Sequence, residues 1–277
     1  MSLLQNIKSE LQKHSTLTIL LIVNIALFFI INISFGIFSF PLYNYLALPL
    51  NSSLFLARFW TLFTYMFSHK DLGHVFYNML LLYFTARTFL GFLSEKKLLF
   101  VYITSGLCGG VLLLLLSVIF PVQFSGSVLY GSSAAVLGVV TSLVMYAPNL
   151  KVSLFGLLEM KYKYYALLVF ALTTIIDFNV NTGGKISHVG GALFGLLFGY
   201  LLKQGKDISV FSFFTRTKKP TLQVVHHNRS HTGTTHTSPN SSSQHTIDSL
   251  LDKISKIGYD NLTKEEKALL FKLSQKK

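Results

Sequence analysis

The stretch Tyr130-Gly131-Ser132-Ser133-Ala134-Ala135-Val136-Leu137-Gly138 decides how the rest of the chain is interpreted. A polar turn led by glycine runs directly into an apolar segment that continues to about Tyr146. This pattern predicts that Ser133 lies at the mouth of a membrane helix, where its hydroxyl is buried but reachable. Serine is common in such helices, so one serine alone indicates little. It gains significance from His74 and His188, because each of them opens another apolar segment.

Composition places the chain among the all-α, polytopic membrane proteins. Of its 277 residues, 51% are hydrophobic and only 13% are charged, with a mean hydropathy of +0.52. A soluble domain carries about twice that charged fraction. The net charge of +13 indicates basic cytoplasmic loops and not nucleic-acid binding. The single cysteine, Cys108, excludes a disulfide framework within the chain. We predict no metal site and no cofactor.

Apolar segments divide residues 1–205 into six predicted membrane spans. They run from about Leu17 to Phe35, His74 to Leu93, Leu98 to Phe120, Ser132 to Tyr146, Tyr164 to Phe178 and Ser187 to Leu202. A bilayer requires about 20 apolar residues for a helical span. A signal peptide is the alternative for the first segment, but the segment is long and no small-residue cleavage site follows it.

Basic residues in the short connections predict the orientation of the spans. Lysines lie in the N-terminal segment, in the second-to-third connection and in the fourth-to-fifth connection. The opposite face carries only Arg58, Lys70 and Lys185. We therefore expect an integral, multi-pass membrane protein with both termini in the cytoplasm.

The composition changes after the last span. Residues 206–246 are predicted to form a flexible linker rich in Ser, Thr, His and Asn. Its histidines are irregularly spaced, which does not favour metal binding. Residues 247–277 regain helical periodicity and are predicted to form a small cytoplasmic hairpin. Thr263 and Glu266 have the spacing of a capping box that opens its second helix. The hairpin is too small to be stable alone, so we expect it to dock on something.

The predicted topology brings three polar residues to one depth. Spans two, four and six enter from the non-cytoplasmic face, and His74, Ser133 and His188 each lie at the start of one of them. Polar groups in membrane helices usually face the protein interior and mark function. A histidine can accept the proton of a serine hydroxyl and so make it nucleophilic. Gly191, Gly195 and Gly199 form a stripe that allows close helix packing. That approach is what a bond between Ser133 and His188 requires.

His74 and Asn78 are four residues apart and share one helix face. Both can donate hydrogen bonds to a developing oxyanion, together with the backbone N–H of Ser133. The alternative is that they make structural bonds between helices. Beside Ser133 and His188, we favour the oxyanion role.

These residues resemble the rhomboid family of intramembrane serine proteases. The resemblance covers roughly residues 15–204. It rests on Trp60, His69, His74-Val-Phe-Tyr-Asn78, Gly131-Ser-Ser133 and His188-Val-Gly-Gly191-Ala-Leu-Phe-Gly195. It implies a six-helix bundle with a Ser133–His188 dyad, an oxyanion hole lined by His74 and Asn78, and a water-filled cavity. It also implies structural roles near the site for Trp60, His69, Gly131, Gly191 and Gly195.

The chain departs from the family pattern at four positions. Ala134 follows the serine where Gly is frequent, and Thr61 follows the loop tryptophan where Arg is frequent. Leu90 occupies a position that is often acidic, and Leu137 replaces a tyrosine that stacks on the histidine in some members. The C-terminal hairpin resembles an extension found on some Bacteroidota members, which implies a bacterial inner membrane.

The leading functional hypothesis is an endopeptidase that cuts transmembrane protein substrates near their outer helix end. The bilayer is its other expected partner. A catalytically inactive rhomboid-like protein that binds transmembrane helices as a chaperone or adaptor is the alternative. A transporter would more naturally show inverted repeats or broken helices, and the sequence shows neither.

Overall fold

The computed structural model describes residues 15–154, 158–175, 182–209, 249–256 and 258–274. The chain forms two compact units, residues 1–218 and residues 219–277. Each unit is described by itself. The predicted linker, residues 206–246, lies outside the described residues from position 210 onward.

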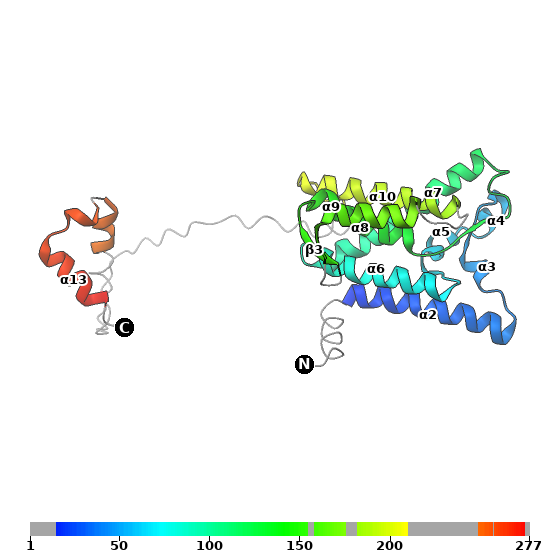
Figure 1. Cartoon of the computed structure of the whole chain (residues 1–277), viewed down its shortest axis with the longest axis horizontal. Helices are drawn as coiled ribbons and strands as arrows, with labels where there is room; N and C mark the ends of the chain where they lie inside the picture. The colour runs from blue at the N-terminus through cyan, green and yellow to red at the C-terminus, as the bar shows by residue number, and fades with distance from the viewer. Residues whose placement is uncertain (1–14, 155–157, 176–181, 210–248, 257, 275–277) are drawn as a thin grey trace, which may run out of the picture. The chain divides into compact units, whose positions relative to one another are not determined.

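Six helical segments of the first unit form a bundle, which can be followed in Figure 1. They are α2 (Ser15–Phe38), α6 (Leu72–Leu90), α7 (Glu95–Ile119), α8 (Ser133–Tyr146), α9 (Tyr162–Phe170), which continues as the π-helical segment η2 (Ala171–Ile175), and α10 (Thr182–Lys203). Helices α2, α7 and α10 are long and apolar enough to cross a membrane, whereas α8 and α9–η2 are shorter apolar helices. The helical membrane fold is as predicted, and the count of six spans stays a prediction.

Helix α8 is the central element of this bundle. It contacts α6, α7, α9 and α10, and every residue from Ala134 to Leu143 is buried. The outer helices instead expose many large apolar side chains, such as Ile22 and Phe29 of α2. In a membrane protein these side chains face lipid. A helix enclosed on all sides does not have to match the bilayer thickness, which accounts for the shortness of α8.

The connection between α2 and α6, for which the sequence analysis predicts no helix or strand, is structured. It contains α3 (Tyr43–Leu46), β1 (Leu48–Pro49), α4 (Ser52–Ala57), α5 (Thr61–Thr64) and the 3₁₀ turn η1 (Tyr65–Phe67). Strand β1 pairs antiparallel with β2 (Val128–Leu129), which precedes α8. The indole N–H of Trp60 donates to the Tyr45 carbonyl at 2.9 Å. Trp60 therefore holds this connection together.

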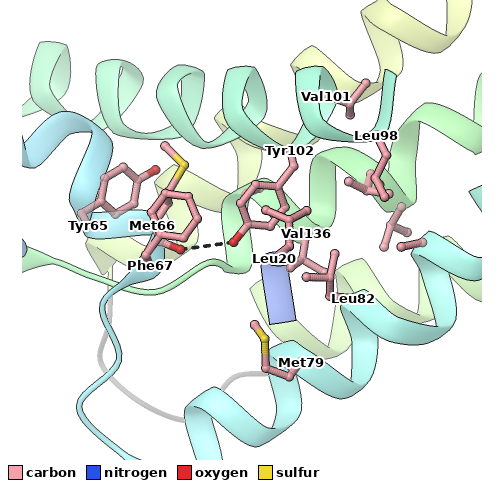
Figure 2. Close-up of a cluster of buried hydrophobic side chains, with 14 of the residues drawn as sticks. Leu20, Tyr65, Met66, Phe67, Met79, Leu82, Leu98, Val101, Tyr102 and Val136 are labelled. Atoms are coloured by element: carbon pink, nitrogen blue, oxygen red, sulfur yellow. Dashed lines mark hydrogen bonds between the residues drawn. The ribbon is translucent and has the colours of Figure 1, made fainter. Parts of the chain in front are cut away.

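Aromatic and aliphatic side chains from several helices fill the core beneath this connection. Figure 2 shows Tyr102 of α7 beside residues of η1, α2, α6 and α8. The Tyr102 hydroxyl donates to the Met66 carbonyl at 3.4 Å and accepts from the Asn24 amide at 3.2 Å. Buried hydroxyl and amide groups are stable when they are paired in this way. These bonds join α2, η1 and α7.

Basic residues and the loops that carry them lie at the opposite end of the bundle. Strands β3 (Lys151–Leu154) and β4 (Leu158–Lys161) form a hairpin between α8 and α9. Lys97 forms an ion pair with Asp207 at 3.1 Å. The carboxylate of Glu95 accepts bonds from the first residues of α2. The start of α2, the start of α7 and the end of α10 therefore lie at one end.

Helix α10 begins earlier than predicted. The sequence predicts a last span from about Ser187, but the helix already includes Thr182, the first described residue after position 175. A Cβ atom at Gly183 would lie 3.4 Å from the Leu113 side chain, which is ordinary contact. The glycine pair therefore packs against α7 as part of the helix. As a result His188 lies in the second turn of α10 and not at its start.

The second unit is a small helical hairpin, as predicted. Residues 249–256 are helical, followed by the 3₁₀ turn η3 (Tyr259–Asn261) and α13 (Lys264–Ser274). The predicted capping box is confirmed. The N–H of Glu266 donates to the Thr263 hydroxyl at 3.3 Å, and the N–H of Thr263 donates to the Glu266 carboxylate at 3.0 Å. Lys253 pairs with Glu266 at 2.6 Å and joins the two helices.

Candidate active site

A turn at Gly131 precedes α8, and Ser133 is the first residue of that helix. Gly131 has a φ of +106°, which glycine adopts without strain. Its N–H donates to the Tyr65 carbonyl at 3.0 Å. A Cβ atom at Gly131 would lie 2.6 Å from Cε1 of His74, so the position also requires glycine for lack of space. This turn brings the His74 ring against the residues that precede Ser133.

The side chains of Ser133 and His188 meet between α8 and α10. The distance from Ser133 Oγ to His188 Nε2 is 2.6 Å. Both residues are only partly buried. At this distance the hydroxyl donates to the ring nitrogen, provided that Nε2 carries no proton. The structure therefore brings together the two residues that the sequence proposes as nucleophile and base.

Glycines of α10 permit this close approach of the two helices. A Cβ atom at Gly191 would collide with the Ala134 carbonyl, and one at Gly195 would collide with the Gly138 carbonyl. The Thr141 hydroxyl donates to the Ala192 carbonyl at 2.9 Å and adds a bond between the helices. The backbones are in contact along this stripe, and no larger residue fits at either glycine.

Thr174 is a site residue that the sequence analysis missed. Its hydroxyl lies in η2, 3.3 Å from Nδ1 of His188. The dyad requires the neutral tautomer with the ring proton on Nδ1. In that tautomer Nδ1 donates to Thr174 Oγ1, and Nε2 accepts from Ser133. Two consecutive threonines in a predicted span gave no sign of this role.

His74 and Asn78 lie on α6 beside the turn, as their spacing predicts. One amide N–H of Asn78 donates to the His74 carbonyl at 3.0 Å. The amide nitrogen also lies 3.5 Å from His69 Nε2. In this state the Asn78 amide is thus engaged with neighbours of its own helix and loop. The oxyanion role of His74 and Asn78 stays a prediction.

His69 supports the residue that precedes the nucleophile. Its Nε2 lies 3.4 Å from the backbone nitrogen of Ser132 and 3.2 Å from the Ser132 hydroxyl, so it serves as an acceptor for them. The ring is completely buried. Burial, together with the nearby His74, lowers the pKa of His69 to about 3. His69 therefore stays neutral over the pH range in which a serine protease works.

The surrounding residues leave room or provide contacts for the four side chains that depart from the family pattern. The Ala134 methyl faces Gly109 of α7, where a Cβ atom would lie 2.8 Å from it, so the glycine supplies the space for this methyl. Leu137 is buried within α8. The Thr61 hydroxyl donates to the Arg58 carbonyl at 2.6 Å, inside the connection itself. Leu90 packs against the core.

Comparison with known protein families matches residues 56–205 to the Rhomboid domain. This match covers more than half of the chain and includes every predicted site residue. Residues 239–276 match a second group, described as a family of unknown function (DUF6576). No curated protein matches the chain.

Proposed function

Because the chain belongs to the rhomboid family, we propose that it is an intramembrane serine endopeptidase with Ser133 as nucleophile and His188 as base. The observation that carries this proposal is the 2.6 Å distance between Ser133 Oγ and His188 Nε2. A serine hydroxyl becomes nucleophilic when an adjacent base accepts its proton. Thr174 supports the proposal, because its hydroxyl can accept from Nδ1 of His188 in the tautomer that the mechanism requires.

The proposed reaction has two steps. In the first, Ser133 Oγ attacks the scissile carbonyl while His188 Nε2 takes the hydroxyl proton and passes it to the leaving amine. This leaves an acyl ester on Ser133. In the second, a water molecule gives a proton to His188 and attacks the ester, and the proton returns to Ser133. Backbone N–H groups at the start of α8 have no partner within the helix and support the oxyanion, with His74 and Asn78 as further donors.

The proposed substrates are transmembrane helices, cut near their outer end. The dyad lies at the α3–α5 end of the bundle, and Lys97, Lys151 and Lys161 lie at the other. Basic loops favour the cytoplasm, which supports an outer position for the dyad. We extend the proposal to a multi-pass protein of a bacterial inner membrane with both termini in the cytoplasm.

A helix-binding protein without catalytic activity is the second candidate. It would use the same bundle but would not need an aligned serine and histidine. The short Ser133–His188 distance and the Thr174 contact favour the enzyme, because binding alone explains neither.

Cleavage of a single-span substrate in proteoliposomes tests the proposal. We expect the wild-type protein to release both fragments, and Ser133→Ala and His188→Ala to abolish cleavage. Ser132→Ala is the matched control, since it removes a neighbouring hydroxyl and should keep most of the activity. Full cleavage by Ser133→Ala, or its loss in Ser132→Ala alone, would show that the nucleophile is wrongly assigned.

A further inference from the structure

Tyr65 is a buried residue to which the proposed mechanism gives no role. It is the first residue of η1, and its side chain is completely buried. Figure 2 shows it beside Met66 of the same turn. A Cβ atom at Gly110 of α7 would lie 3.0 Å from Cε1 of the Tyr65 ring, so this glycine leaves the ring its place against α7. Both the backbone and the side chain of Tyr65 make contacts that bear on the dyad.

The backbone carbonyl of Tyr65 supports the turn that precedes the nucleophile. It accepts the N–H of Gly131 at 3.0 Å. Gly131 lies two residues before Ser133, which begins α8. The bond therefore joins the connection between α2 and α6 to the segment that leads into α8, and it holds the start of that helix.

The hydroxyl of Tyr65 extends in turn to the helices that carry and support the base. It donates to the Gly106 carbonyl of α7 at 2.5 Å. The Ser187 hydroxyl is a second hydrogen-bond partner of the same phenol oxygen. Ser187 is buried in α10 and directly precedes His188. One residue thus bonds to the chain just before the nucleophile and to the chain just before the base.

Helix α7 is in contact with the neighbours of both dyad residues at a single position. A Cβ atom at Gly109 would lie 2.8 Å from the Ala134 methyl and 2.6 Å from the Ser187 carbonyl oxygen. Ala134 follows the nucleophile, and Ser187 precedes the base. Gly106, which accepts from Tyr65, lies three residues before Gly109, about one helical turn away. The bond from Tyr65 therefore fixes α7 close to the point where α8 and α10 meet it.

We propose that Tyr65 is a positioning residue that sets the separation of Ser133 and His188. Its carbonyl holds the turn before the nucleophile, and its hydroxyl holds the turn of α10 that carries the base. Misplacing a reacting group by about 1 Å can cost about 100-fold in rate. The inference rests on the proposed function, because this separation affects a rate only if the dyad reacts.

Tyr65→Phe tests the proposal, because it removes the hydroxyl and keeps the ring and the carbonyl. On a transmembrane substrate we expect kcat to fall at least about 10-fold while KM stays within about 2-fold, since only the geometry of the dyad changes. The rate constant for fluorophosphonate labelling of Ser133 in detergent should fall by a similar factor, and the fraction labelled at completion should stay that of the wild type. A purely structural role predicts the reverse, a smaller labelled fraction with an unchanged rate constant, and that result would overturn the proposal.

The matched control is Tyr162→Phe, which removes another completely buried tyrosine hydroxyl. Tyr162 begins α9, directly after the β3–β4 hairpin at the other end of the bundle. Within the described part of the chain its hydroxyl has no hydrogen-bond partner. We expect this variant to keep kcat and the labelling rate within about 2-fold of the wild type. Equal losses in the two phenylalanine variants would show that the effect is not specific to Tyr65.

Ser187→Ala tests the link to α10 separately. It should lower the labelling rate at least about 3-fold, and the double variant with Tyr65→Phe should lose less than the product of the two single losses, because partners in one bond are not independent. Losses that multiply would overturn the link. The wild type separates this inference from the proposed function. An unlabelled wild type would refute the reactive dyad and the inference with it, whereas a labelled wild type and an equally fast Tyr65→Phe would refute the inference alone.

Discussion

At the scale of single residues, hydrogen bonds and close contacts with neighbouring side chains position Ser133 and His188. Thr174 Oγ1 lies 3.3 Å from Nδ1 of His188, and Ser133 Oγ lies 2.6 Å from Nε2. With the ring proton on Nδ1, Thr174 accepts from the ring and Nε2 accepts from Ser133. His69 holds Ser132 from the other side. Gly131 allows the His74 ring to approach the turn. Ser133 is thus positioned by its contact with His188 and by the contacts of the residues that precede it in the chain.

Thr174→Val should lower kcat on the order of 10-fold with little change in KM. Loss of one neutral hydrogen bond changes a free energy by about 1.4 kcal/mol, and that is a factor of ten in rate. Thr174→Ser keeps the hydroxyl and should restore most of the rate. Thr173→Val is the matched control, because the Thr173 hydroxyl bonds the Val169 carbonyl of its own helix at 2.8 Å. Its oxygen also lies 3.5 Å from that of Thr174, so we expect a loss smaller than that of Thr174→Val. Kinetics on a fluorogenic transmembrane substrate measures both parameters, and equal losses in the two valine variants would remove Thr174 from the site.

The roles of Ser133 and His188 could be proposed from sequence because each combines a reactive group with an adjacent run of small residues. The role of Thr174 could not. A threonine in a helix ordinarily bonds a carbonyl one turn earlier, as Thr173 does. Which of the two threonines faces His188 depends on the π-helical turn of η2, and no residue pattern in the sequence announces that turn.

At the scale of elements, the contact between α8 and α10 determines the separation of the dyad. Small residues at every fourth position of α10 lie against the α8 backbone. The sequence predicts this stripe, since glycine at that spacing is informative in a membrane helix. It did not predict where α10 begins, because glycines also occur in turns and only contact with α7 decides between the two. The structured connection between α2 and α6 was missed for a related reason: its helices are too short for periodicity to reveal them.

Gly195→Ala should destabilise the bundle by roughly 1–3 kcal/mol, the cost of overpacking a tight contact. Its added methyl would collide with the Gly138 carbonyl and push α10 away from α8. Gly183→Ala on the same helix is the control, since its methyl meets Leu113 at an ordinary 3.4 Å. Both changes replace a glycine of α10 with alanine. Thermal unfolding in detergent should show a lower Tm only for Gly195→Ala, and equal Tm values for the two variants would refute the close-packing account.

At the scale of the whole molecule, the dyad and the lysine-rich connections lie at different ends of the first unit. The dyad lies at one end, and the ion pair between Lys97 and Asp207 lies at the other with the β3–β4 hairpin. Lysine counts in the connections predict this polarity, but contacts within the protein do not reveal which side of a membrane each end faces. The second unit, which matches a family of unknown function, is a separate body, and its expected docking stays a prediction.

Labelling of introduced cysteines tests the predicted orientation. In a Cys108→Ala background, Val122→Cys should react with a membrane-impermeant maleimide in spheroplasts. Val122 is 86% exposed and follows α7 at the dyad end. Lys96→Cys, at the start of α7, should react only after the membrane is permeabilised. The reverse pattern would place the dyad on the cytoplasmic side and overturn the proposed cleavage near the outer helix end.

The central claim is that His188 activates Ser133, and covalent labelling by a fluorophosphonate tests it most directly. An activated serine reacts with this group, whereas an ordinary buried serine does not. We predict that the folded, purified protein is labelled at Ser133, as peptide mapping by mass spectrometry would show, and that His188→Ala is not labelled. Labelling should decline as the pH falls and His188 becomes protonated, while His69, with a pKa of about 3, stays neutral. The absence of any label with probes of several sizes, or a label on Ser132 in place of Ser133, would contradict the account.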